Sequence, residues 1–78
     1  MNLRKLFKDT TNNFRIVDFI LVRGHIDTAE YHELGICCHT ARVTEIRHIL
    51  RLHDYDIVAH RIQGSRSYRY VIRKWGEG

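Results

Sequence analysis

The sequence contains no proline and only two cysteines, Cys37 and Cys38, which are neighbours in the chain. Very small secreted domains usually depend on several disulfides, and this pair cannot supply them, so we expect an intracellular protein. The longest apolar run, Phe19 to Val22, is far shorter than the roughly 20 residues of a membrane-spanning helix. No apolar stretch near the N-terminus is long enough for a signal peptide. These absences argue against a membrane span and against secretion, and they favour a cytoplasmic location.

The motifs of common enzyme classes are absent too: there is no glycine-rich phosphate loop, no Gly-x-Ser-x-Gly elbow and no His-Glu-x-x-His. A chain of 78 residues without a repeat or linker forms one domain. Such a domain buries only about 60% of its unfolded surface, so a deep substrate pocket would take most of its core. Asp54 and Asp56, beside His53, are more typical of a turn than of a catalytic cluster. We therefore expect a protein that is not an enzyme and takes neither a small-molecule substrate nor a cofactor.

A zinc site is the main alternative that the cysteines raise, because His32 and His39 lie close to Cys37 and Cys38 in the sequence. Structural zinc usually takes cysteine pairs separated by two to four residues, and adjacent cysteines cannot easily occupy two tetrahedral corners. We therefore expect no metal. The default interpretation is that both thiols are buried in a turn, where they pack as small apolar groups.

Positive charge is in excess and is unevenly distributed along the chain. The net charge is +4, and ten of the thirteen cationic residues are arginine, whose planar fork suits phosphates and guanine edges. Residues 1–8 and 36–53 are basic, whereas residues 9–35 carry five acids against two arginines. Residues 57–76 carry five cations and no acid. Basic elements behind an acidic support are typical of a nucleic-acid face, and a solvated basic hairpin is the open alternative.

Two helices are predicted in the first half of the chain. Apolar residues between Asn12/Asn13 and Gly24 fit a helix of about three turns, with asparagine as the cap and glycine as the left-handed stop. His25 and Ile26 form a short bridge. Asp27 and Glu30 form a capping pair that opens a second helix, Thr28 to about Leu34, and Gly35 ends that helix.

The second half predicts a third helix and a hairpin. From Cys38 or His39 to about His53, Val43, Ile46 and Leu50 form an apolar stripe with Ile49 on its flank, and Leu52 falls outside it. A separate polar stripe, which we expect to face outward, contains Thr40, Thr44, Arg47 and Arg51. The runs Asp56 to Gln63 and Ser67 to Trp75 are rich in isoleucine, valine, tyrosine and arginine, and they read as an antiparallel pair.

This order of elements, and several short motifs, resemble the small winged helix-turn-helix domains of tailed bacteriophages and prophages. The resemblance covers about residues 14–75, and the matching segments are Leu34-Gly35-Ile36, Ala41 to Arg47, Tyr55-Asp56-Ile57 and Tyr68-Arg69-Tyr70. The chain departs from the pattern in having about one extra helical turn between Arg47 and Tyr55, and Asp54 where a glycine is usual. The resemblance implies an α+β winged helix in a bacterial host cell, associated with the nucleoid. It assigns residues 12–76 to this domain and leaves residues 1–11 as a basic N-terminal arm.

In such a domain the third helix enters the major groove and the hairpin lies along the backbone or minor groove. The candidate DNA contacts are His39, Thr40, Arg42, Thr44, Arg47, His48 and Arg51 on the helix, and Arg66, Arg69 and Arg73 on the hairpin. An ordinary solvated helix face is the alternative for the first set, and an ion pair between Arg42 and Glu45 is at least as plausible as a DNA contact. Tyr68, Tyr70 and Ile72 are expected to cover the core, and stacking of the tyrosines on bases is the alternative.

The sequence therefore predicts a small double-stranded DNA-binding protein, either a transcriptional regulator or an accessory factor such as an excisionase. A protein-interaction module is the rival reading, because winged helices also serve as docking domains. Leu3, Leu6 and Phe7, interleaved with Arg4, Lys5 and Lys8, could form an amphipathic arm that binds a host or phage protein. A homodimer could form through this arm or through the first helix.

Overall fold

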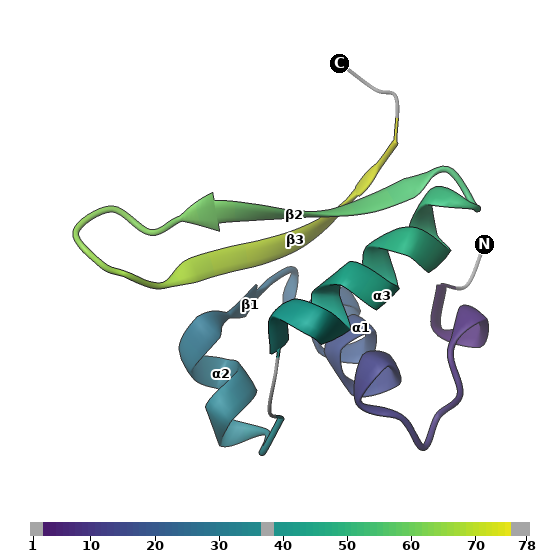
Figure 1. The fold of residues 1–78 in the computed structure, drawn as a ribbon, viewed down its shortest axis with the longest axis horizontal. Helices are drawn as coiled ribbons and strands as arrows, with labels where there is room; N and C mark the ends of the chain where they lie inside the picture. Colours follow the sequence, from purple (N-terminus) through teal and green to yellow (C-terminus); the bar gives the residue numbers. More distant parts are fainter. Residues whose placement is uncertain (1–2, 37–38, 76–78) are drawn as a thin grey trace.

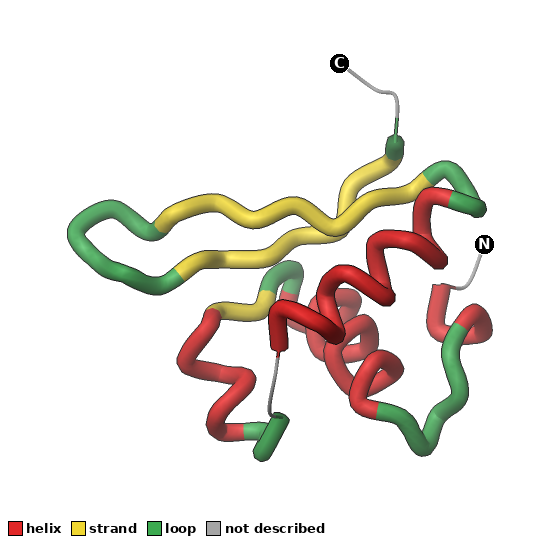
Figure 2. The backbone as a smooth tube through the Cα atoms, viewed as in Figure 1, coloured by secondary structure: helices red, strands yellow, loops and turns green. Residues whose placement is uncertain are grey.

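Helices cover one face of an antiparallel sheet in this protein (Figures 1 and 2). The computed structural model describes residues 3–36 and 39–75. The elements in these two stretches are the 3₁₀-helix η1 (Leu3–Leu6), α1 (Asn12–Arg23), β1 (Ile26–Asp27), α2 (Thr28–Glu33), α3 (His39–Arg51), β2 (Tyr55–Arg61) and β3 (Tyr68–Lys74). The expected α+β class, with three α-helices followed by a hairpin, is confirmed. The arrangement is compatible with a winged-helix layout.

The sheet has three strands in the described part of the chain, in the order β1-β3-β2, and both pairings are antiparallel. β2 and β3 form the expected hairpin, in which Ile57 lies opposite Ile72 and Ala59 opposite Tyr70. The segment expected as a short bridge is itself a strand, because Ile26 pairs with Tyr70. The hairpin extends past the helices at its turn, whereas α1 and α3 cover its other end (Figure 1).

The ends of α1 follow local hydrogen bonding. Thr11 is the N-cap, since its Oγ1 accepts a hydrogen bond from the backbone N–H of Phe14 at 3.2 Å. The expectation that Asn12 or Asn13 caps the helix is corrected here, because both belong to its first turn. Gly24 ends the helix at a φ of +90°, as expected, and its N–H donates to the carbonyl of Ile20.

The second and third helices lie close to their predicted bounds. At the start of α2, Glu30 accepts a hydrogen bond from the N–H of Asp27 at 2.9 Å, as the capping pair predicts. Gly35 follows α2 with a φ of +72°, a conformation that glycine adopts without steric cost. α3 ends at Arg51, so Leu52 lies beyond the helix and is 71% exposed.

The core lies between the helices and the sheet. The predicted stripe of α3 is confirmed, since Val43, Ile46 and Leu50 are all buried. The buried residues from the other elements are Ile16, Val17 and Ile20 of α1, Ile26 of β1, Tyr31 of α2, Ile36, Ile57 of β2 and Tyr70 of β3. A single cluster joins these side chains, which fixes α3 against the hairpin.

The N-terminal stretch belongs to the same core, which differs from the expectation of a separate arm. Leu3 and Phe7 are buried, and Leu6 packs against the core cluster. Arg4 pairs with Asp18 of α1 at 2.6 Å, which holds η1 against that helix. Leu3 and Phe7 therefore belong to the core of the domain and do not form a separate amphipathic arm. No helix within residues 3–36 and 39–75 has the length and apolar content needed to cross a membrane.

Candidate nucleic-acid interface

Two arginines of the predicted outward stripe on α3 bind the neighbouring strand. The Nε of Arg47 lies 3.2 Å from Oδ1 of Asp56, and its Nη2 donates to the carbonyl of Ile57 at 2.9 Å. Arg51 reaches the other carboxylate oxygen of Asp56 at 3.4 Å. Asp56 is only 5% exposed, and its Oδ1 also accepts a hydrogen bond from the N–H of Ile57 at 2.8 Å. The structure therefore brings Arg47 and Arg51 together, but around a carboxylate of β2.

Trp75 adds a second intramolecular contact to this group. Its ring lies under the guanidinium of Arg51, with 4.4 Å between the guanidinium carbon and the ring centroid. The distance is that of a cation–π contact. Neither Asp56 nor Trp75 was predicted from the sequence as a partner of these arginines. Charge was the signal that could have indicated Asp56, because Asp54 and Asp56 are the first two acids that follow the arginines of α3 in the sequence.

The remaining candidates on α3 fall into three environments. Arg42 pairs with Glu45 at 2.8 Å, so the ion-pair alternative is the one observed. Thr40, Thr44 and His48 are exposed, and the hydroxyl of Thr44 donates to the carbonyl of Thr40 at 3.0 Å. His39 is half-buried. The charged side chains of α3 are thus all paired within the protein.

His39 belongs to an aromatic cluster beneath the hairpin. Its ring stacks on that of Tyr31 with 5.0 Å between centroids, and Tyr70 meets Tyr31 edge to face. Tyr70 covers the core as expected, whereas Tyr68 is 44% exposed. Burial, followed by the neighbouring Tyr70, raises the pKa of Tyr31 well above its ordinary value. Burial likewise raises the pKa of Tyr70. Both rings therefore stabilise the fold as neutral phenols.

The hairpin arginines divide into one that is paired and three that are not. Arg69 binds Asp27 at 3.0 Å, and this hydrogen bond raises the pKa of Arg69. Arg61, Arg66 and Arg73 are exposed, and none of them has an ion pair or a side-chain hydrogen bond among the described residues. Arg61 was not among the site residues predicted from the sequence. The pairing of the two hairpin strands would have indicated it, because Arg61 lies opposite Tyr68 directly before the turn.

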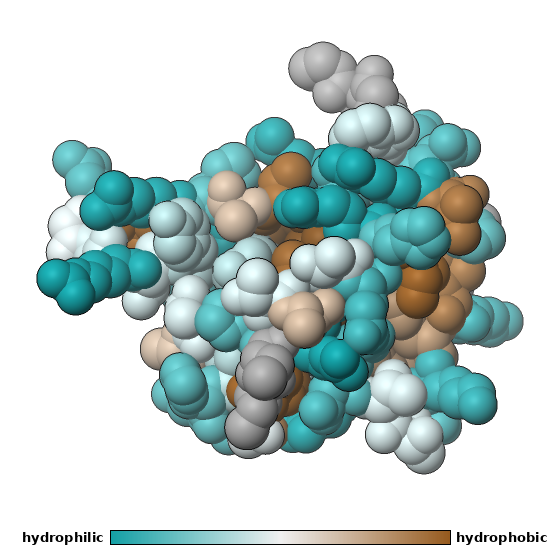
Figure 3. Space-filling view, in the orientation of Figure 1, coloured by the Kyte–Doolittle hydropathy of each residue, from teal (hydrophilic) through white to brown (hydrophobic). Residues whose placement is uncertain are grey.

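The turn of the hairpin forms an open hollow of about 450 Å³. Its lining consists of Arg61, Gln63, Gly64, Ser65 and Arg66. Hydrophilic side chains cover this projecting end of the molecule (Figure 3). Two guanidinium groups therefore flank one hollow at the point farthest from the helices.

A possible cation site among the described residues is opposed by ion pairs with neighbouring arginines. Donor atoms of His25, Asp27 and Glu30 lie within 4.8 Å of one another. Asp27 is paired with Arg69, however, and Glu30 with Arg23 at 3.2 Å, so two guanidinium groups neutralise the carboxylates that a metal would need. Cys37 and Cys38, on which the expectations of no zinc and of buried thiols rest, lie outside the described residues.

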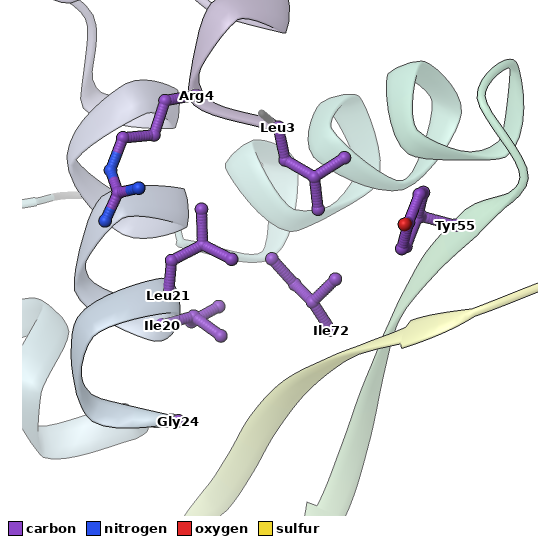
Figure 4. Close-up of a pocket in the computed structure, with 7 residues that line it drawn as sticks. All are labelled: Leu3, Arg4, Ile20, Leu21, Gly24, Tyr55 and Ile72. Carbon is purple, nitrogen blue, oxygen red and sulfur yellow. The ribbon is translucent and has the colours of Figure 1, made fainter. Parts of the chain in front are cut away.

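A groove lies between η1, α1 and the hairpin (Figure 4). Its volume is about 500 Å³, and the lining residues are Leu3, Arg4, Ile20, Leu21, Gly24, Tyr55 and Ile72. Figure 4 shows Leu3, Leu21 and Ile72 pointing into the same space from η1, α1 and β3. The lining is mixed, because Arg4 and Tyr55 add polar atoms to the apolar side chains.

Comparisons with protein-family models, with curated proteins and with solved structures find no match for this chain. Its function must therefore be argued from the chemistry of its own residues.

Proposed function

We propose that this chain is a winged helix that binds double-stranded DNA, acting as a small regulator or as an accessory factor such as an excisionase. The element order α1-β1-α2-α3-β2-β3 and the sheet order β1-β3-β2 support this proposal. In a winged helix, α3 approaches the major groove and the β2–β3 hairpin lies along the duplex. The motifs that resemble phage domains favour the same class.

The observation that carries the proposal is the charge of the hairpin. No acid lies between Ile57 and Trp75, and this segment contains Arg61, Arg66 and Arg73, which are exposed and have no intramolecular partner among the described residues. Such cations gain free energy by neutralising phosphates and releasing the counterions condensed on DNA. A hairpin that only needed to be soluble would gain little from three unpaired arginines without an acid between them.

The test is the salt dependence of binding to a duplex of random sequence, measured by fluorescence anisotropy at several salt concentrations. If Arg61, Arg66 and Arg73 each neutralise a phosphate, log affinity should fall against log salt with a slope of about −3. The variant with all three arginines changed to alanine should retain its fold and lose most of the slope. Binding with no salt dependence, or an unchanged slope in the variant, would exclude this role for the hairpin.

Docking on another protein is a second candidate, and the apolar surface favours it. Val22 and Leu52 are each 71% exposed, and the lining of the groove in Figure 4 includes apolar side chains from η1, α1 and β3. A partner protein or a second copy of the chain would cover such a surface by apolar burial, which depends weakly on salt. Salt dependence therefore separates the two functions.

A further inference from the structure

We infer that the turn of the β2–β3 hairpin inserts Arg61 and Arg66 into the minor groove of A·T-rich duplex DNA, and that this turn, rather than α3, distinguishes base sequences. The inference rests on the proposed DNA binding and concerns which element reads the duplex. It follows from how the arginines of the two elements are engaged within the protein.

Each arginine of α3 has a partner within the protein that a base would have to replace. An arginine that recognises guanine uses two N–H groups at once. Arg47 already uses its Nε and Nη2 on Asp56 and Ile57. If it turned toward a base, the nearly buried carboxylate of Asp56 would lose one of its two guanidinium partners, which is unfavourable.

The other cations of α3 face the same difficulty. Arg51 shares Asp56 and contacts the ring of Trp75, and Arg42 pairs with Glu45. The exposed hydroxyl of Thr44 donates its proton to the helix backbone. Thr40 and His48 remain, and they can contact a phosphate or a base edge without the bidentate geometry that gives strong discrimination.

The hairpin turn offers what α3 does not. Arg61 at the end of β2 and Arg66 in the turn line the same hollow, and neither has a partner in residues 3–36 or 39–75. The backbone between them is ordered by a hydrogen bond from the N–H of Ser65 to the carbonyl of Ile62, at 3.1 Å. The N–H of Ser67 donates to the hydroxyl of Ser65, also at 3.1 Å. Two free guanidinium groups are therefore held by an ordered turn.

The shape of the turn suits the minor groove. Gly64, with a φ of +78°, has no side chain at its apex, and the turn projects past the helices (Figures 1 and 3). The minor groove is only about 6 Å wide in B-form DNA, so it admits arginine side chains that extend from a turn but not a helix. In A·T tracts this groove is narrower still and strongly negative, so it attracts arginine, whereas G·C pairs place an amino group on its floor.

Three duplexes of equal length distinguish the two grooves. Their central tracts contain A·T, G·C or inosine·C pairs. Inosine lacks the 2-amino group of guanine, so an inosine·C pair resembles A·T in the minor groove and G·C in the major groove. We expect the protein to bind the A·T and inosine·C duplexes equally, and each at least fivefold more tightly than the G·C duplex.

Two double variants locate the discrimination. Arg61→Ala with Arg66→Ala should bind the three duplexes with equal affinity. The matched control, Lys8→Ala with Arg73→Ala, removes two exposed charges away from the turn, and should lower all three affinities by similar factors while keeping the preference. Circular dichroism and thermal unfolding would verify that both variants remain folded.

The outcomes separate this inference from the proposed function. If the protein binds inosine·C like G·C, the major groove is read and the inference fails, although DNA binding stands. Equal affinity for all three duplexes in the wild type, or discrimination that survives in the Arg61/Arg66 variant, has the same consequence. If no duplex is bound in a salt-dependent manner, the proposed function fails as well.

Discussion

Asp56 is a single carboxylate that stabilises the edge of the sheet and holds two arginines. β2 is an outer strand of the sheet, so the backbone groups on its free side need partners from outside the ladder. At Ile57, the N–H donates to Asp56 and the carbonyl accepts from Arg47. This group of three residues satisfies the strand edge with side chains from α3 and β2. It also neutralises part of the positive charge of Arg47 and Arg51, whose side chains remain partly exposed.

Asp56→Asn should therefore destabilise the domain. The amide keeps the shape of the side chain but removes the charge that Arg47 and Arg51 share, and these guanidinium groups are 39% and 47% exposed. We expect a loss of about 1–3 kcal/mol in the free energy of unfolding, since solvent screens the two partners. Urea unfolding measures it. Asp54→Asn is the matched control, because Asp54 has a φ of +66°, which asparagine tolerates well. Equal losses in both variants would contradict the role of Asp56.

Tyr31 is a buried phenol whose hydroxyl has no hydrogen-bond partner in the described part of the chain. An unpaired buried hydroxyl costs free energy, so Tyr31→Phe should leave stability at neutral pH unchanged or raise it by about 1 kcal/mol. Urea unfolding at pH 7 tests this. Tyr68→Phe, at an exposed ring, is the control and should have no effect. A clear loss of stability in Tyr31→Phe would show that the hydroxyl is hydrogen-bonded after all.

The same residue predicts a loss of stability in alkali. Because the pKa of Tyr31 is raised in the folded state above its ordinary value of about 10, the phenolate forms first in the unfolded chain. The titration of Tyr31 therefore leaves the free energy of unfolding unchanged below pH 10. Above pH 10 it lowers the free energy of unfolding by up to about 1.4 kcal/mol per pH unit. Urea unfolding at pH 9 and pH 11 should show a smaller loss for Tyr31→Phe than for the wild type. An identical loss in both proteins would contradict this.

At the scale of elements, the sequence predicted those whose signal is local. The stripe Val43, Ile46 and Leu50 located α3, and Gly24 and Gly35 marked helix ends, because periodicity and left-handed stops depend on neighbouring residues alone. β1 was read only as a bridge. Two residues carry no periodicity, and Ile26–Asp27 is a strand only because β3 lies beside it.

For the candidate site, too, only the local spacing of residues could be predicted from the sequence. Helical spacing correctly grouped Arg47 with Arg51, but spacing cannot say whether a stripe meets solvent or another element. Their partner, Asp56, lies on the next strand and becomes their neighbour only when α3 packs on β2. On the hairpin, alternation along β3 suggested Arg69 as a contact, yet the pairing of β3 with β1 brings that arginine to Asp27.

The start of α1 gives a prediction at this scale. Thr11→Ala removes the hydroxyl that accepts the N–H of Phe14, so α1 should lose its N-cap. The expected cost is about 1 kcal/mol of the free energy of unfolding, because one of the first four N–H groups of the helix is left without a protein partner. Thermal or urea unfolding measures it. Thr10→Ala, at the exposed residue just before, is the control and should be neutral. An equal effect of both changes would mean that the cap contributes nothing.

For the molecule as a whole, the two candidate binding surfaces lie apart. The unpaired arginines Arg61 and Arg66 lie at the hairpin turn, whereas the groove of Figure 4 lies between η1, α1 and the other end of the hairpin. A duplex at the turn would therefore leave the groove accessible. The two candidate functions can coexist, and variants at one surface should not disturb the other as long as the shared core remains intact.

That core includes the N-terminal stretch, which gives the last prediction. Phe7 is buried in the same cluster as α1 and α3, so Phe7→Ala should cost about 2–4 kcal/mol. A domain of this size has a total stability of roughly 4–12 kcal/mol, so the midpoint of thermal unfolding should fall by about 10 °C or more. Lys8→Ala, at the exposed neighbour, should leave the midpoint unchanged. If residues 1–11 instead formed an arm separate from the domain, both variants would melt like the wild type, and only binding to a partner would change. Scanning calorimetry of the three proteins decides between these outcomes.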